Sequence, residues 1–268
     1  MGVTEVAIAD HIATVTLNRP EARNALNPEL IIELAEGWQS LAANDDVRVI
    51  VVTAAEGTTF CSGFDLGTTI PIMTGARAPS DEFEQRLAEN LDLMGIATLR
   101  DFDPGKPVIA AAAGHAIAGG MELLLAADMR VVAEGVKLGL SEVALGLIPA
   151  MGGTARLARH LPRAVAMELL LMAQPVISDS LAAHGLINRL VPADEVLSTA
   201  MALAERLAAN APLAVRAARE VIRASDDATE AEALAMEAER SAQLARTEDA
   251  VEGPRAFMEK RAPQFTGR

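Results

Sequence analysis

Two glutamates lie in apolar stretches of the sequence, where an ionised carboxylate is unfavourable. Glu122 lies in the apolar run "GHAIAGGMELLLAADMR", residues 114–130, and Glu142 lies among small and apolar residues in "GLSEVALGLIPAMGG". Removing a carboxylate from water is unfavourable unless the group is paired, hydrogen-bonded or neutralised. Burial and mutual repulsion push the pKa values of two neighbouring carboxyl groups apart, which suits acid–base chemistry.

The spacing of the two glutamates does not by itself bring them together. They are twenty residues apart, which on one continuous helix would place them roughly 200° apart, on opposite sides. Gly135 and Gly139 also interrupt any such helix. If the pair cooperates, the fold must assemble it, and the spacing leaves this open.

Glycine turns supply a second kind of functional group, namely backbone N–H groups. Gly119 and Gly120 precede "MELLLAAD", which predicts a helix whose first N–H groups are free to face an anion or a developing oxyanion. A second glycine turn, "TTFCSGFDLG", follows a strand predicted at 47–53. Two loops that leave neighbouring strands could each direct one N–H at the same carbonyl oxygen.

The elements that must position these groups follow from periodicity. Alternating residues in "VTEVAIADHIATVTLN" predict a hairpin, and Asn27 with Pro28 opens a helix. Strands are predicted in "DVRVIVVTA", "PVIAAAAG", "MRVVAE" and "LINRLV", a loop at 67–80, and helices at 82–100, after 114, and at 151–159, 163–173, 179–184, 193–210, 213–224, 228–247 and 249–260. This alternation predicts an α/β core with mainly parallel pairing to about residue 190, followed by a helical tail.

Composition excludes several classes of protein. The chain has 268 residues, of which 51% are hydrophobic, enough for a substantial core. A formal net charge of −14 and the absence of Tyr argue against nucleic acid as a partner. Cys61 is the only cysteine, which excludes an internal disulfide and a Cys-rich metal site. We find no signal peptide and no membrane-length apolar run, and so predict a cytoplasmic protein without membrane contact.

Several blocks resemble the crotonase (enoyl-CoA hydratase/isomerase) superfamily in order and spacing over nearly the whole chain. They are "LNRPEARNAL", "TFCSGFDL", "GHAIAGGMELLLAADMRV", "LGLSEVALGLIPAMGGTARL", "GLINRLV" and "EDAVEGPRAFMEKRAP". Each block alone is weak evidence, but together they are highly specific. The resemblance implies an α/β spiral of ββα turns over residues 1–190, which holds the active site, and a helical region at 191–268 for oligomerisation and site closure.

The resemblance also implies an activity, the syn addition of water across the 2,3-double bond of an enoyl-CoA thioester. The amides of Phe64 and Gly119 would form the oxyanion hole. Glu122 would orient and deprotonate the attacking water at C3, and Glu142 would deliver or accept the proton at C2. The division of acid and base roles between the two glutamates stays open.

No prosthetic group or metal is implied, because coenzyme A is part of the substrate. The implied coenzyme A residues are Arg23, Ala25 and Leu26 of "RNAL", Ser62, Gly63, Asp65 and Leu66 of "SGFDL", and Phe257 and Lys260 of the last helix, acting toward a neighbouring subunit. The implied partners are the acyl-CoA thioester and copies of the chain in a homotrimer or a dimer of trimers.

The sequence also departs from the family pattern. Ser141 precedes Glu142 where hydratases of short-chain substrates commonly carry Pro, and "GTTIPIMTGARAPSDEFEQ" does not reveal the acyl chain. The tail resembles the carnitinyl-CoA dehydratase branch. Isomerisation of an enoyl-CoA and dehydration of a hydroxyacyl-CoA therefore remain alternatives, as does a non-catalytic or RNA-binding member of the family.

Several of these residues also have purely structural interpretations. Taken alone, Glu122 could stabilise a helix N-terminus, and Glu142 could be a solvated residue at a helix start. The matched blocks favour catalysis for both. We expect Asp65 to be the N-cap of the helix after the loop, Cys61 to be a small buried packing residue, and His115 to be structural.

Overall fold

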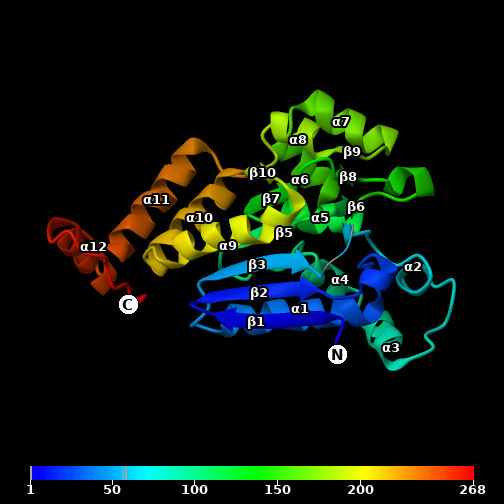
Figure 1. Ribbon diagram of the computed structural model, residues 1–268, viewed down its shortest axis with the longest axis horizontal. Helices are drawn as coiled ribbons and strands as arrows, with labels where there is room; N and C mark the ends of the chain where they lie inside the picture. The colour runs from blue at the N-terminus through cyan, green and yellow to red at the C-terminus, as the bar shows by residue number, and fades with distance from the viewer. Residues whose placement is uncertain (1, 56, 58) are drawn as a thin grey trace.

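The computed structural model describes residues 2–55, 57 and 59–268 and contains two β-sheets covered by helices (Figure 1). The larger sheet has six strands in the order β1-β2-β3-β5-β7-β10, and the smaller has four in the order β4-β6-β8-β9. The strands are β1 (Thr4–Ala9), β2 (Ile12–Leu17), β3 (Val49–Ala54), β4 (Thr59–Cys61), β5 (Val108–Ala112), β6 (His115–Ile117), β7 (Met129–Ala133), β8 (Lys137–Gly139), β9 (Val176–Ile177) and β10 (Arg189–Val191).

The larger sheet forms as its sequence predicts. β1 and β2 pair antiparallel, and Asp10 and His11 take positive φ angles of 49° and 66° in the turn between them. The other neighbours in this sheet pair in parallel. The unbroken apolar sequences of β3 and β5 fit this position, because both faces of a parallel sheet are covered by helices.

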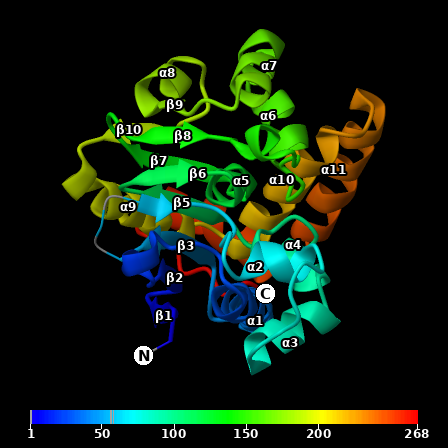
Figure 2. The same cartoon turned by 90° about the vertical axis from the view of Figure 1, so that its right-hand side faces the viewer.

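Helix α1 (Pro28–Ala43) begins where its capping signal lies. The Asn27 side chain accepts a hydrogen bond from Leu30 N, and Pro28 is the first helical residue. Trp38 is fully buried, and its Nε1 donates to Ala97 O over 2.9 Å, at the end of α4 (Asp92–Ala97). α1 and the later helix α9 (Val196–Ala208) lie on opposite sides of the larger sheet (Figure 2).

The smaller sheet was not predicted from the sequence. Its strands have only two or three residues, too few to give an alternating pattern. β3, β5 and β7 of the larger sheet are followed by β4, β6 and β8 of the smaller one, and α5 (Gly119–Ala126) follows β6. The chain therefore rises as repeated ββα turns, which confirms the predicted spiral fold.

The predicted helices are also present, with local corrections. The loop predicted at 67–80 contains a short helix, α2 (Thr69–Met73), and the helix predicted at 82–100 is divided into α3 (Glu82–Glu89) and α4, with Asn90 ending α3. The later helices are α6 (Gly153–His160), α7 (Arg163–Met172), α8 (Ser178–Ala183), α9, α10 (Pro212–Ser225), α11 (Glu230–Leu244) and α12 (Glu248–Met258).

The predicted C-terminal region has two parts with different surroundings. α9 packs against β3, β5 and β7 of the larger sheet, whereas α11 and α12 extend away from it (Figure 1). The division at residue 190 stays a prediction. Among the helices in the described part of the chain, none combines the length and apolar character needed to cross a membrane.

Candidate active site

Two glycine loops meet at one edge of the smaller sheet. β4 and β6 pair in parallel, so the loops that follow them leave the sheet side by side. Gly63 has a φ of +94°, and a Cβ built on it would lie 2.7 Å from Ala118 Cβ and 3.1 Å from Gly119 N. Only glycine at position 63 permits this close approach of the two backbones.

Two further glycines, Gly119 and Gly120, pack closely against β4 and the loop that follows it. A Cβ on Gly120 would overlap the Cys61 carbonyl at the end of β4. A Cβ on Gly119 would lie 3.1 Å from two ring atoms of Phe64. The start of α5 therefore rests directly on the loop that carries Phe64, and the amides of Phe64 and Gly119 are brought to one place.

The direction of the Phe64 amide is set by Leu26. Leu26 N donates to Gly63 O over 2.8 Å, and Asp65 N donates to Leu26 O over 3.1 Å. Because C=O and N–H point in opposite directions across a planar trans peptide, the Phe64 N–H points away from Leu26. In residues 2–55, 57 and 59–268, neither this N–H nor that of Gly119 donates a hydrogen bond. Both amides can therefore donate to a carbonyl oxygen.

Ala118 makes the turn that precedes the Gly119 amide. Its φ of 51° and ψ of −126° lie in a region that favours glycine, and such a conformation costs about 1–3 kcal/mol. The residue is held there from both sides: Ala118 N donates to Gly139 O, and Glu122 N donates to Ala118 O. A strained non-glycine residue next to free amides is typical of a functional site.

Glu122 lies in the first turn of α5 and is almost fully buried. Its Oε1 accepts hydrogen bonds from Met151 N over 2.7 Å and from Gly153 N over 2.9 Å, at the N-terminus of α6. Burial raises the pKa of Glu122 to about 7, and the charge of Glu142 adds to the rise, while the two N–H groups and Arg156 oppose it. Both protonation states are therefore populated near neutral pH.

Glu142 approaches the site from the third strand of the smaller sheet. It follows β8, the parallel neighbour of β6, and begins a 3₁₀ turn, Glu142–Leu145. Burial raises its pKa, and its Oε2 is buried without a hydrogen-bond partner in the described part of the chain. The fold thus brings the two glutamates close enough for the charge of one to raise the pKa of the other.

The "RNAL" and "SGFDL" loops also lie against each other. Arg23 is exposed and takes a left-handed φ of 55°, and its carbonyl accepts a hydrogen bond from Ser62 N over 3.1 Å. Ala25 is half-buried, Leu26 is buried beside Phe64, and Leu66 is 62% exposed. These loops form one surface next to the paired amides.

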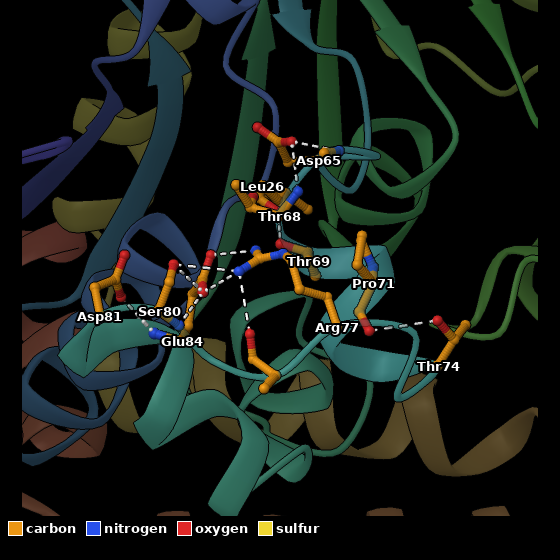
Figure 3. Close-up of polar contacts among 12 residues, drawn as sticks. Leu26, Asp65, Thr68, Thr69, Pro71, Thr74, Arg77, Ser80, Asp81 and Glu84 are labelled. Atoms are coloured by element: carbon orange, nitrogen blue, oxygen red, sulfur yellow. Dashed lines mark hydrogen bonds and ion pairs between the residues drawn. The ribbon is translucent and has the colours of Figure 1, made fainter.

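Asp65 holds the turn that leads from this surface into α2 (Figure 3). Its carboxylate accepts from Gly67 N over 2.9 Å and from Thr68 N over 3.2 Å, and it pairs with Arg19 over 2.8 Å. The N-cap of α2 is Thr68. The prediction of Asp65 as the N-cap is therefore wrong: the side chain stabilises the preceding turn and an ion pair.

The segment after Asp65 is fixed at both ends (Figure 3). The buried Thr69 hydroxyl donates to Leu26 O over 2.7 Å. Farther along, Arg77 pairs with Glu84 through two hydrogen bonds of 2.5 and 2.8 Å, and Glu84 also accepts from Ser80 N. This segment is the one that the family resemblance implies for the acyl pocket.

The structure does not bring Phe257 and Lys260 to this site within one chain. Phe257 lies on α12 and is 81% exposed, and the exposed Lys260 follows that helix. In Figure 1, α12 and α2 lie at opposite ends of the molecule. A contribution of these two residues to the site of a neighbouring subunit stays a prediction.

Sequence reasoning missed the donors that hold Glu122. Met151 and Gly153 contribute only their backbone amides, so their side chains give no chemical signal. The pair Gly152–Gly153 directly before a helix could have predicted a group of free amides for an anion. Gly152 has a φ of +101° and is the N-cap of α6.

The remaining candidates are structural. Cys61 is fully buried, and burial raises the pKa of its thiol to about 12, which confirms a packing residue. His115 Nδ1 accepts a hydrogen bond from Lys137 N over 2.9 Å. Across the residues that the structure describes, no group of three His, Cys, Asp or Glu side chains is placed to hold a metal ion.

Comparison with known proteins gives full-length matches. Residues 7–268 match the family model described as enoyl-CoA hydratase/isomerase. The chain is 37% identical over 260 residues to an enoyl-CoA hydratase of Mycobacterium tuberculosis, covering 96% of this chain and 94% of that protein. It is 35% identical over 264 residues to a carnitinyl-CoA dehydratase of Proteus mirabilis, covering 96% and 95%. A crystal structure of an enoyl-CoA hydratase from Mycobacterium tuberculosis superimposes with a TM-score of 0.89 at 34% identity, covering 100% of both chains.

Proposed function

Since the chain belongs to the enoyl-CoA hydratase/isomerase (crotonase) family, whose members act on acyl-CoA thioesters, we propose that it is an enoyl-CoA hydratase. The reaction is the syn addition of water across the 2,3-double bond. The proposal is supported chiefly by the charge coupling between buried Glu122 and half-buried Glu142, whose Oε2 is buried without a partner among the described residues. The amides of Phe64 and Gly119, which donate no hydrogen bond in the described residues, support it further.

The two amides act on the thioester carbonyl. When water adds at C3, negative charge develops on the thioester oxygen as an enolate. The N–H groups of Phe64 and Gly119 donate to that oxygen and stabilise the charge. Because the backbone already holds both amides in place, little reorganisation is required, and one such donor contributes about 10²- to 10³-fold in rate.

The two glutamates handle the protons. Glu122 takes a proton from the water as the water oxygen bonds to C3, and Glu142 in its acid form gives a proton to C2. A pKa of about 7 suits Glu122 to accept and release a proton near neutral pH. Burial also raises the pKa of Glu142, which favours the protonated form that an acid requires. Return of the proton from Glu122 to Glu142 through water restores the starting state.

The coenzyme A part of the substrate binds along the surface made by the "RNAL" and "SGFDL" loops. Exposed Arg23 supplies a positive charge for the phosphates, and Leu66 supplies apolar contact. Asp65 acts indirectly, because its carboxylate is engaged with Arg19 and the turn. Phe257 and Lys260 reach the site of a neighbouring subunit in a homotrimer or a dimer of trimers.

A second candidate is dehydration of a hydroxyacyl-CoA, which is the same chemistry in reverse. The 35% identity to a carnitinyl-CoA dehydratase supports it. Isomerisation of an enoyl-CoA moves one proton between two carbons and does not require a second glutamate. Product analysis by mass spectrometry separates the three, because only hydration and dehydration change the mass, in opposite directions.

The test is the loss of enone absorbance when the purified protein meets crotonyl-CoA. We expect turnover in the wild type and a fall of at least about 10²-fold in Glu122→Gln and in Glu142→Gln. Substitution by Gln keeps the shape of each side chain and removes its acid–base function. No turnover on crotonyl-CoA, longer, branched or carnitinyl thioesters would contradict the proposal. Turnover that survives both substitutions would contradict the roles of the glutamates.

A further inference from the structure

Arg156 is a half-buried cation with no carboxylate partner among the described residues. Its Nη2 donates to Leu99 O over 2.5 Å, and its Nη1 donates to Met151 O over 3.4 Å. Within the described residues it forms no ion pair, whereas the next arginine on α6, Arg159, pairs with Asp227 over 2.5 Å. A partly desolvated charge that lacks a counterion costs stability. Such a residue is a candidate for a functional role.

The guanidinium of Arg156 lies on the turn that holds Glu122. Gly152 takes a φ of +101°, and a Cβ built on it would lie 2.8 Å from Arg156 Nη1. The carbonyl of Met151 accepts from Arg156, while the amides of Met151 and Gly153 donate to Glu122 Oε1. One face of this turn therefore contacts Arg156, and the N–H groups of the turn donate to the Glu122 carboxylate.

We propose that Arg156 is a positioning residue for Glu122. Through the turn at 151–153 it fixes the two donors of the carboxylate, and its positive charge favours the ionised form of Glu122. The proposal rests on the proposed function only in taking Glu122 as the base. It assigns Arg156 no contact with substrate.

The charges that act on Glu122 come from two sides. Glu142, beyond the end of β8, disfavours the ionised form of Glu122 whenever it is itself ionised, and Arg156, on α6, favours that form. Arg156 in turn lies near Arg100, Asp101 and Arg223, and its guanidinium stays protonated at any working pH. A neutral side chain at 156 leaves burial and Glu142 unopposed by this charge. The pKa of Glu122 then rises further, and less of the base form is present at neutral pH.

We expect substitution at Arg156 to be compatible with folding. Arg156 lines a cleft of about 780 Å³ between α6, α9 and α10, to which Arg159 and Arg219 also contribute. Water can fill the space that a shorter side chain leaves in this cleft, so no sealed apolar cavity forms. The substrate-facing amides of Phe64 and Gly119 belong to other loops.

The experiment compares the pH dependence of kcat/KM for the wild type, Arg156→Gln, Arg156→Lys and Arg159→Gln. Arg159→Gln is the matched control, because it removes an equal charge from the same helix without touching the turn. We expect the acid limb to move to higher pH in Arg156→Gln, so that kcat/KM at pH 6 falls about threefold or more beyond any change on the alkaline plateau. Arg156→Lys retains the charge and should lie between Arg156→Gln and the wild type.

Two outcomes would overturn the proposal. One is an acid limb in Arg156→Gln that coincides with the wild type. The other is a limb that moves equally in Arg159→Gln, since the effect would then reflect net charge. Circular dichroism spectra and melting temperatures of the four proteins verify that each is folded.

A second measurement separates this inference from the proposed function. The carboxyl carbon of Glu122 is followed by NMR in protein labelled with ¹³C at glutamate Cδ, and its signal is assigned by its loss in Glu122→Gln. We expect a higher titration midpoint in Arg156→Gln than in the wild type, whether or not any thioester is turned over. An inactive wild type with this shift would overturn the hydratase proposal and support the role of Arg156. An unchanged midpoint would overturn the role of Arg156 alone.

Discussion

Glu84 and Glu122 are both glutamates with almost no exposed surface, 3% and 1%, yet their pKa values move in opposite directions. Glu84, on the α2–α3 segment, is held by Arg77 through two hydrogen bonds and by Ser80, and the contact with Arg77 lowers its pKa to about 2. Glu122, on α5, has two amide donors and a negative neighbour, and burial raises its pKa to about 7.

The difference shows how a fold fixes the charge of one buried carboxylate and leaves another able to titrate near neutral pH. A guanidinium placed directly against Glu84 fixes its charge, so this residue holds the segment together. At Glu122 the nearest compensation consists of neutral amides, with Arg156 on the far side of the turn. The ionised form of Glu122 is only partly stabilised, so this carboxyl group can gain and lose a proton near neutral pH.

The largest difference that we expect between Glu122 and Glu84 is in catalytic activity. We expect Glu122→Gln to lose about 10²- to 10⁴-fold in kcat, because it removes a principal acid–base group. Glu84→Gln, which has the same change of charge and the same shape, should lose less than about tenfold and lower the melting temperature by about 2–4 °C. Steady-state kinetics and thermal unfolding check both. A collapse of kcat in Glu84→Gln with retained folding would contradict the structural assignment.

The dependence of stability on pH should distinguish the same two residues. Glu122 has a higher pKa in the folded protein than its ordinary value of 4.5, so the folded state holds its proton more tightly than the unfolded chain. Its contribution to the free energy of unfolding therefore falls as pH rises from about 4.5 to about 7, by at most about 3 kcal/mol. Glu84 has a lower pKa when folded, so its contribution is present above about pH 4.5 and is lost as pH falls toward 2.

Urea unfolding at a series of pH values measures these contributions. We expect Glu122→Gln to flatten the fall between pH 4.5 and 7 and to be more stable than the wild type at pH 8. Glu84→Gln should leave that fall in place and weaken the loss of stability below pH 4.5. Equal curves for Glu122→Gln and the wild type would mean that Glu122 titrates as it does in the unfolded chain.

The smallest expected effect concerns the backbone beside Glu122. Ala118→Gly removes a Cβ from a residue with a φ of 51°, next to the packed Gly63. We expect stability to rise by about 1 kcal/mol, because relief of strain exceeds the added freedom of the unfolded chain. Denaturant unfolding measures this change, and a less stable variant would show that Ala118 is not strained.

Much of this arrangement could be predicted from the sequence. The long strands of the larger sheet and the capped helix at Asn27 carry strong local signals. The glycines at 63 and 119 and the two glutamates carry the chemistry in their residue types. Their close approach could not be derived from spacing, because it depends on strands of two or three residues that have no periodic pattern.

The parts that sequence reasoning missed are those made by backbone and by distant partners. The donors to Glu122 are amides, which every residue except proline carries, so only the fold selects Met151 and Gly153. The local sequence wrongly predicts Asp65 as an N-cap, because its partner Arg19 lies 46 positions away and leaves no local signal. Arg156 carries no functional signal in the sequence, because an arginine in an amphipathic helix is ordinarily a solvated residue.

The smaller sheet has one further consequence. Phe64, Gly119 and Glu142 follow three adjacent parallel strands, β4, β6 and β8. Neighbouring strands are roughly 4.8 Å apart, so the row extends over roughly 10 Å, and its intervals are set by main-chain hydrogen bonds. The separations of these three positions therefore do not depend on side-chain packing. If the segment between Asp65 and Glu84 shapes the acyl pocket, as the family resemblance implies, it can diverge while these three positions keep their separations.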